Sequence, residues 1–235
     1  MGEIAYIGNE LALFEQATAW KKYYGRFLNP FLKGSVLEVG AGIGGTTREL
    51  CDGTQKEWLC LEPDPDLYYV LDNKIKQKQL PGCCSSLKGT TADLPQEEKF
   101  NAIIYIDVIE HIEKDAEELA RANTLLAEDG FLIVLVPAHQ SLYSEFDKAI
   151  GHYRRYDKGM LMTAAPEKVR LIKMMYLDSL GLLASLTNKY FLKQEYPTVK
   201  QIGFWNRFIV PVSKITDPIL NYSVGKTLVA IWQRK

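Results

Sequence analysis

The 235-residue sequence lacks a marked excess of charge of either sign, and it also lacks any long apolar run. Its formal net charge of −1 gives no electrostatic reason to expect a nucleic-acid partner. No run of about eighteen consecutive apolar residues occurs, so we expect no transmembrane segment. Residues 1–10 have neither the basic segment nor the apolar core of a secretory signal. We therefore expect a cytoplasmic protein.

Cysteine is scarce in this chain, and its spacing does not form a recognised motif. The four cysteines include no Cys-x-x-Cys pair of the kind that binds metal ions, and they are Cys51, Cys60, Cys83 and Cys84. We expect buried thiols in a reducing compartment rather than a disulfide framework. Internal repeats, low-complexity tracts and flexible linkers are also absent from the sequence. Residues 1–235 are therefore expected to form one domain.

The most informative stretch is residues 36–47, which predicts a strand, a glycine turn and the start of a helix. Residues 36–39 supply the apolar run of a buried parallel strand. The alternating glycines that follow let the backbone turn sharply and approach a ligand closely. Gly40, Gly42 and Gly45 also fit the G-x-G-x-x-G pattern, in which a pyrophosphate lies at a helix N-terminus. The loop alone leaves a dinucleotide and S-adenosylmethionine as alternatives.

Two carboxylates near this loop are informative, and the first of them, Glu38, favours S-adenosylmethionine. Glu38 lies two residues before the first glycine, where it would repel a pyrophosphate but attract the ammonium and sulfonium charges of S-adenosylmethionine. Glu62 ends the next apolar run, about twenty residues after the glycines, where an acid can bind both ribose hydroxyls. The sequence therefore predicts Glu62 as the ribose ligand.

Further along the chain, strands alternate with helices. We expect strands at residues 85–90, 100–107 and 131–136, and helices at residues 46–50, 65–79 and 115–126. Asp115 and Glu118 resemble a capping box at the start of the last helix, and residues 128–130 should end it. This alternation predicts a doubly wound parallel sheet with ligands at the carboxyl ends of its strands. Acidic or histidine side chains fall at four such ends, at Glu38, Glu62, Asp107 and His139.

Four segments together carry a family resemblance: residues 38–44, 107–111, 136–139 and 151–156. Their sequences EVGAGIG, DVIEH, VPAH and GHYRRY resemble class I S-adenosylmethionine-dependent methyltransferases, within a branch of small bacterial-type enzymes. The resemblance implies a seven-stranded, mostly parallel α/β sheet of Rossmann type, with residues 169–176 and 227–233 as antiparallel final strands. It also implies S-adenosylmethionine as cofactor. The residues expected to bind it are Glu38, Gly40, Ala41, Gly42, Gly44, Glu62, Pro63, Asp93, Leu94 and Asp107.

Two helical regions should flank this sheet. Apolar residues recur at three- and four-residue steps over residues 11–28, which predicts a helix that packs on the sheet or covers the cofactor. Residues 177–226 form an unusually long apolar insertion before the last strand, interrupted by glycine and proline. This helical cap could pack on the core, form a homodimer contact, or line a groove for a lipid-linked acceptor that contacts Trp205.

Histidines are few, and all three lie near the expected site. Methyl transfer is an in-line displacement, so alignment and exclusion of water supply much of the rate. A base is needed only when the acceptor carries a proton. We expect His152 or His139, and after them His111, to serve as that base.

The segment 151–156 also offers groups that could bind the acceptor. Tyr153, Arg154 and Arg155 could hold a phosphate or carboxylate in a bidentate contact. Alternatively, the two arginines could neutralise carboxylates of the chain itself in a structural network, namely Glu110, Glu145 or Asp147.

The pattern Asp107-x-x-Glu110-His111 is similar to the metal-ligand segment of the ubiquinone-pathway O-methyltransferases and the small-RNA 2′-O-methyltransferases. Those enzymes have glutamate at the first position, and the shorter Asp107 reduces the reach, so we expect no metal. In the alternative, Asp107 holds the methionine part of the cofactor while Glu110 orients His111.

These features favour a methyltransferase that acts on oxygen, and in second place on nitrogen, of a small or lipid-linked metabolite. A nicotinamide-dependent oxidoreductase is a second hypothesis, against which Glu38 and the Asp93-Leu94 pair argue. A third is a non-catalytic cofactor-binding protein whose cap binds a protein partner.

Overall fold

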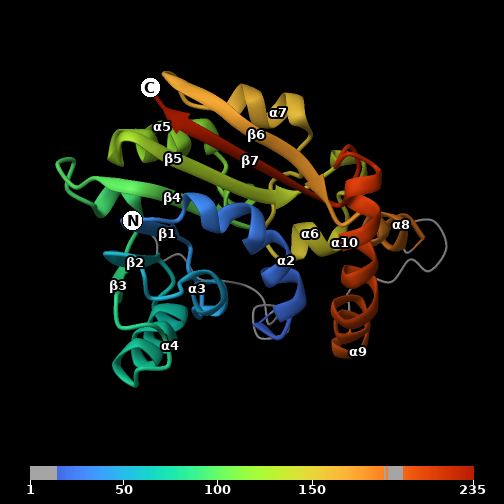
Figure 1. Ribbon diagram of the computed structural model, residues 1–235, viewed down its shortest axis with the longest axis horizontal. Coiled ribbons are helices and arrows are strands. Elements are labelled where there is room, and N and C mark those ends of the chain that lie inside the picture. Colours follow the sequence, from blue (N-terminus) through green and yellow to red (C-terminus); the bar gives the residue numbers. More distant parts are fainter. Residues whose placement is uncertain (1–14, 188, 190–197) are drawn as a thin grey trace.

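The computed structural model describes residues 15–187, 189 and 198–235, and its centre is a seven-stranded sheet (Figure 1). The strand order is β3-β2-β1-β4-β5-β7-β6, and β7 runs antiparallel to both of its neighbours while the other pairs are parallel. The strands are β1 (Ser35–Val39), β2 (Glu57–Glu62), β3 (Cys84–Lys88), β4 (Phe100–Ile106), β5 (Leu126–Pro137), β6 (Val169–Leu177) and β7 (Thr227–Arg234). The predicted α/β sheet and its antiparallel final pair are confirmed.

Helices cover both faces of the sheet (Figure 1). They are α2 (Thr18–Leu28), α3 (Gly45–Leu50), α4 (Pro65–Lys76), α5 (Asp115–Leu125), α6 (Glu145–Ala149), α7 (Lys158–Ala164), α8 (Ser179–Thr187), α9 (Val199–Phe204) and α10 (Val210–Ile219). Shorter 3₁₀ turns are η1 (Asn29–Phe31), η2 (Thr91–Asp93), η3 (Ile109–His111) and η4 (Gln140–Leu142), and η6 (Trp205–Ile209) is a π-helix. Trp20 and Trp205 belong to the core on one face, whereas Leu119 and Leu161 belong to the core on the other.

The strand β5 begins earlier than the sequence indicated. It starts at Leu126, so residues 128–130 lie inside the strand instead of ending a helix. The ladder between β4 and β5 shifts its register between Phe100 and Ala102. A Cβ on Gly130 would lie 2.9 Å from the Ala127 carbonyl oxygen and 3.1 Å from that of Phe100. Gly130 therefore permits this irregularity, and the prediction of a helix stop there was wrong.

The predicted capping box at the start of α5 is also wrong. The residue before the helix is Lys114, which makes no side-chain cap. Asp115 instead accepts a 2.6 Å hydrogen bond from Tyr156, and Glu118 accepts one of 2.7 Å from Tyr105. Both carboxylates are thus used for tertiary contacts, which local spacing does not reveal.

The cap predicted at residues 177–226 contains α8, α9, η6 and α10 at the end of the sheet where β4 and β5 terminate (Figure 1). Its inner side is fixed by buried aspartates. Asp178 accepts hydrogen bonds from Trp205 Nε1 at 2.7 Å and Ser213 Oγ at 2.6 Å. Two parts of the predicted helical regions, residues 11–14 and 190–197, lie outside the described residues. Within the described ranges, no helix combines the length and apolar character needed to cross a membrane.

Candidate cofactor and acceptor site

The glycine turn follows β1 and leads into α3. Gly40, Gly42 and Gly44 have φ angles of +66°, +56° and +79°, a left-handed backbone region that favours glycine. A Cβ at Gly40 would lie only 2.7 Å from a methyl group of Val108, so this position also needs glycine for space. The first amides of the turn are anchored to the neighbouring strand, because those of Gly40 and Ala41 donate to the Leu61 carbonyl. The turn is thus rigidly placed at the carboxyl end of the sheet.

Glu62 lies at the end of β2 and contacts this turn directly. Its carboxylate accepts hydrogen bonds from the Gly42 amide at 2.7 Å and from the Asp64 amide at 2.9 Å. Pro63 lies between these two acids and directs the chain into α4, whose first turn Asp64 caps. Burial raises the pKa of Glu62 above its ordinary value. The structure therefore brings together the glycine turn and the predicted ribose ligand.

Glu38 occupies a different place from the one expected. Its carboxylate is buried and accepts hydrogen bonds from Thr47 Oγ1 at 2.7 Å and Trp58 Nε1 at 2.8 Å. Burial raises its pKa to about 7. Glu38 thus joins β1 to α3 and β2, and we correct the expectation that its charge meets the cofactor directly.

Asp107 follows β4 with a φ of +54°, an uncommon conformation for a residue with a side chain. Its amide donates a 2.9 Å hydrogen bond to the Leu135 carbonyl, which fixes it at the end of the neighbouring strand. Asp107 is exposed as a residue, yet desolvation of its carboxyl group by the surrounding protein raises its pKa to about 6. The positive charges of Lys226 and Lys21 partly oppose this rise, and the sequence pattern gave no sign of either lysine.

Asp93 and Leu94 follow β3, as expected for residues near an adenine. Leu94 is buried in the core. Asp93 closes the η2 turn by accepting hydrogen bonds from the Thr90 amide at 2.8 Å and the Thr90 hydroxyl at 3.0 Å. These bonds hold the pKa of Asp93 below its ordinary value.

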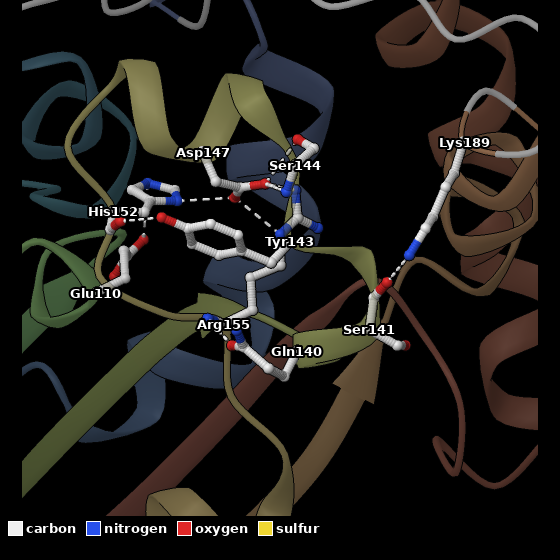
Figure 2. Close-up of polar contacts among 9 residues, drawn as sticks. All are labelled: Glu110, Gln140, Ser141, Tyr143, Ser144, Asp147, His152, Arg155 and Lys189. Atoms are coloured by element: carbon white, nitrogen blue, oxygen red, sulfur yellow. Dashed lines mark hydrogen bonds and ion pairs between the residues drawn. The ribbon is translucent and has the colours of Figure 1, made fainter.

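Glu110 and His111, which follow Asp107 along the chain, form a group of histidines and carboxylates with Asp147 and His152. The rings of His111 and His152 meet edge to face, with centroids 4.5 Å apart. His152 Nδ1 lies 2.9 Å from Asp147 Oδ1, and its Nε2 lies 3.9 Å from Glu110 Oε1 (Figure 2). Burial and the nearby His152 lower the pKa of His111 to about 4. His111 is therefore neutral at ordinary pH.

Asp147 is the centre of this group, and the sequence named it only as a possible arginine partner. Arg155 binds it through two nitrogens, at 2.8 and 2.9 Å, and the Ser144 amide and hydroxyl donate to it (Figure 2). Burial opposes its ionisation, but the hydrogen bonds from His152 and Arg155 outweigh burial and keep its pKa below the usual range. Asp147 is thus a charged group that orients His152.

Among the described residues, Glu110, in contrast to Asp147, lacks hydrogen-bond partners for its carboxyl group. It is fully buried, and within the described part of the chain neither carboxylate oxygen has a hydrogen-bond partner. Burial, together with the charge of Asp107, raises its pKa well above the ordinary value. Glu110, His111 and His152 each offer a ligand atom within 4.8 Å of the others. Compared with the metal pattern considered from the sequence, His152 stands here in place of Asp107.

The structure places both arginines in ion pairs with carboxylates of this chain. Arg154 forms a 2.7 Å ion pair with Asp115 and donates to the Glu113 carbonyl, also at 2.7 Å. Arg155 is bound to Asp147, as described above. Both guanidinium groups therefore neutralise carboxylates of this chain, which is the structural alternative. Tyr153 is 53% exposed and remains available to an acceptor.

Two other predicted site residues lie in separate environments. His139 stacks on Tyr176 with ring centroids 5.1 Å apart, and its Nε2 lies 2.9 Å from the Gly225 carbonyl oxygen. Trp205 is buried against Trp20, with Lys226 Nζ 4.0 Å from its ring centroid. These positions do not support His139 as the base or Trp205 as an acceptor contact.

Comparison with known proteins gives the family. A family model described as "Methyltransferase domain" matches residues 13–187, and the match ends before α9. No curated protein matches the sequence. Similar solved structures include a geranyl diphosphate methyltransferase in complex with S-adenosylmethionine, with a TM-score of 0.66 and 11% identity over 97% of this chain and 91% of that one.

Two further solved structures share the fold at similarly low sequence identity. A putative sarcosine dimethylglycine methyltransferase from Galdieria sulphuraria has a TM-score of 0.61 and 13% identity, over 93% of this chain and 84% of that one. The N-methyltransferase NodS from Bradyrhizobium japonicum, solved with S-adenosylhomocysteine, has a TM-score of 0.60 and 11% identity, over 97% and 93%. Because the family model covers well over half of the sequence and the sheet has the class I topology, the chain belongs to the methyltransferase-domain family and is an enzyme of that class.

Proposed function

We propose that this enzyme transfers a methyl group from S-adenosylmethionine to an oxygen, and in second place to a nitrogen, of a small or lipid-linked acceptor. The observation that carries the proposal is the convergence of the glycine turn, Glu62 and Asp107 at the carboxyl ends of β1, β2 and β4. Ligands of doubly wound sheets bind at this edge. The family match to methyltransferases favours this function over a nicotinamide-dependent oxidoreductase.

Glu62 can hold the ribose without giving up its present contacts. An ionised carboxylate has about four acceptor sites, and Glu62 uses two of them for the Gly42 and Asp64 amides. The remaining sites can accept hydrogen bonds from both ribose hydroxyls. The bonds to the two amides also fix the carboxylate relative to the glycine turn, so little conformational entropy is lost on binding.

Asp107 is the acid best placed to meet the positive charges of the cofactor. Asp107 is an exposed residue at the end of β4, whereas Glu38 is buried among protein donors. An ammonium or sulfonium group nearby favours the ionised form of Asp107 and so opposes the rise of its pKa to about 6. We assign to Asp107 the electrostatic role that the sequence suggested for Glu38.

His152 is the candidate base when the acceptor carries a proton. The charged Asp147 accepts from Nδ1, which fixes the tautomer with Nε2 free to take a proton. Nε2 lies 3.9 Å from Glu110, whose pKa burial raises well above its ordinary value, and a positive imidazole there would favour the ionised form of Glu110. We therefore assign Glu110 and His111 to proton handling around His152 rather than to a metal.

An apolar stripe on the outer side of α9 to α10 supports a lipid-linked acceptor. Its members recur at three- and four-residue steps, with exposed fractions of 57%, 53%, 44%, 64% and 72%, at Phe204, Phe208, Val212, Ile215 and Ile219. Contiguous exposed apolar surface of this kind usually marks an interaction site. The helices α9 and α10, which carry these residues, lie at the end of the sheet where β4 and β5 terminate, and there an acceptor would approach the cofactor (Figure 1).

The direct test is product identification. Purified enzyme and S-adenosylmethionine labelled in the methyl group are incubated with lipid and aqueous fractions of a bacterial extract, and labelled products are identified by mass spectrometry. We expect label on an oxygen of a lipid-soluble product. Label confined to water-soluble products would contradict the lipid-linked acceptor. Failure to bind S-adenosylmethionine in calorimetry would contradict the proposed function itself.

A further inference from the structure

Three of the four cysteines meet at one point, although the sequence separates them. Cys51 follows α3, Cys83 precedes β3, and Cys84 is the first residue of β3. The Cys51 sulfur lies 3.4 Å from that of Cys83 and 3.6 Å from that of Cys84. All three sulfur atoms lie within 4.8 Å of one another.

The topology explains why these thiols converge. Helix α3 starts at the glycine turn and returns to the amino end of the sheet, where Cys51 ends it. Strand β3 is parallel to β2 and begins at the same end, with Cys84 opposite Trp58. The Trp58 amide donates a 2.9 Å hydrogen bond to the Cys83 carbonyl, which fixes the backbone there. The cluster thus lies at the opposite end of the sheet from the cofactor site.

We propose that Cys51, Cys83 and Cys84 form a three-thiolate site for a thiophilic d¹⁰ metal ion, Zn²⁺ or Cu⁺. Thiolates are the ligands that these ions prefer. Tetrahedral Zn²⁺ with bonds of about 2.3 Å places its sulfur ligands about 3.8 Å apart. The observed separations of 3.4 and 3.6 Å therefore need only a small outward movement of the sulfur atoms.

The surroundings provide access and a possible fourth ligand. Cys51 and Cys84 are buried, while Cys83 is half-buried and opens the cluster toward solvent. Gln55 Oε1 lies 3.4 Å from the Cys51 sulfur, and Gln55 Nε2 is held by the Leu32 carbonyl at 3.1 Å. This oxygen or a water molecule would complete a tetrahedral shell. Each thiol that binds as a thiolate releases one proton to solvent, and no electron is transferred.

The fourth cysteine supplies a matched control. Cys60 is buried in β2, with its sulfur 3.6 Å from Thr47 Oγ1 and outside the group formed by the other three. A Cys60→Ala variant removes one thiol without touching the cluster. Any effect of thiol number alone would therefore also appear in this variant.

Metal binding by the reduced, metal-stripped full chain tests the proposal. Zn²⁺ and, without oxygen, Cu⁺ are each titrated in competition with a chromophoric chelator, and Co²⁺ serves as a visible probe for the Zn²⁺ arm. We expect one tightly bound ion per chain and a sulfur-to-Co²⁺ charge-transfer band. Cys83→Ser should weaken binding by more than about 100-fold, since loss of a direct ligand should exceed the 10- to 100-fold cost of losing a supporting contact. Cys60→Ala should bind as the unaltered protein does.

Alkylation provides a second measurement that does not depend on a folded variant. Bound metal should protect Cys51, Cys83 and Cys84 of the unaltered protein from iodoacetamide, as read by peptide mass spectrometry. Absence of stoichiometric binding for both ions would overturn the proposal, as would equal loss in Cys60→Ala. It would also be overturned if no metal binds while air oxidation removes two hydrogens and links Cys51 to Cys83, because the thiols would then be a redox pair.

Discussion

The Tyr23 hydroxyl donates a 2.6 Å hydrogen bond to Asp217 Oδ2, joining α2 to α10 across 194 positions of sequence. Asp217 is fully buried and also accepts from the amides of Asp178 and Ser179, at 2.7 and 2.9 Å. One carboxylate therefore fastens the N-terminal helix, the end of β6 and the cap together. Among the described residues of the cap, the inner side is part of the core and the outer side is exposed.

This contact predicts the first mutational effect. Tyr23→Phe should lower the free energy of unfolding by about 1–2 kcal/mol, because it removes one buried hydrogen bond to a charged acceptor. Urea denaturation measures the change, and Tyr69→Phe, at a side chain that is 68% exposed, is the control. Equal stability of the two variants would show that the Tyr23 bond does not fasten α2 to the cap.

Glu38 predicts an unusual pH dependence. Its pKa is raised from 4.5 to about 7, so between these values the folded protein binds more protons at this site than the unfolded chain does. The stability that Glu38 contributes is therefore fully present below pH 4.5 and is lost as the pH rises to about 7, by about 3 kcal/mol. Glu38→Gln keeps an acceptor for Thr47 and Trp58 without this loss.

The measurement is the difference in unfolding free energy between Glu38→Gln and the unaltered protein at pH 5 and pH 8. From pH 5 to pH 8, we expect the unfolding free energy of Glu38→Gln to rise relative to that of the unaltered protein by up to about 3 kcal/mol. Glu57→Gln, at an exposed position in the same region of the sheet, should show no such change. Parallel pH profiles for Glu38→Gln and the unaltered protein would contradict the raised pKa.

Glu62 predicts a loss of cofactor affinity. Glu62→Ala should weaken S-adenosylmethionine binding by about 1–3 kcal/mol, because the ribose hydroxyls lose their acceptor. Isothermal titration calorimetry gives the affinity, and circular dichroism shows whether the variant is still folded. Glu57→Gln, at the opposite end of β2, should bind normally. An affinity within error of the unaltered protein would mean that another residue holds the ribose.

Replacing the candidate base should change turnover but not cofactor affinity. His152→Ala should reduce turnover about 10²- to 10⁴-fold while cofactor affinity stays nearly constant, because a base acts only in the chemical step. His139→Ala should retain most of its turnover, since this ring is engaged with Tyr176 and the Gly225 carbonyl. Near-normal turnover of His152→Ala from pH 6 to 9 would show that catalysis rests on positioning alone.

The apolar stripe predicts an effect on the acceptor only. Serine at both Phe204 and Phe208 should raise the KM for a lipid-linked acceptor and leave cofactor affinity and melting temperature unchanged. Tyr69→Ser, which removes an even more exposed ring on α4, should not alter KM. A large fall in melting temperature with unchanged KM would make the stripe part of the core. Conversion of a dimer to a monomer, seen by light scattering, would make it a homodimer contact.

Local sequence signals were sufficient to predict the fold and which residues lie at the carboxyl ends of the strands. Apolar runs, glycine spacing and the alternation of strands with helices are local signals, so they predicted six strands to within about two residues and placed Glu62 and Asp107 at strand ends. The strand β5 was the exception, because its start depends on pairing with Phe100 across a register shift. Sequence spacing cannot show that partner.

The partners of individual side chains could be seen only in the folded structure. Arg154 and Arg155 are neighbours in sequence, yet one pairs with Asp115 and the other with Asp147. Cys51 lies 32 positions from Cys83, and their sulfur atoms are 3.4 Å apart. Such contacts depend on where helices return and how strands pair over long separations, and no local pattern records them. Residue type and spacing are thus sufficient to predict the architecture. The partners of the arginines, carboxylates and thiols depend on tertiary packing.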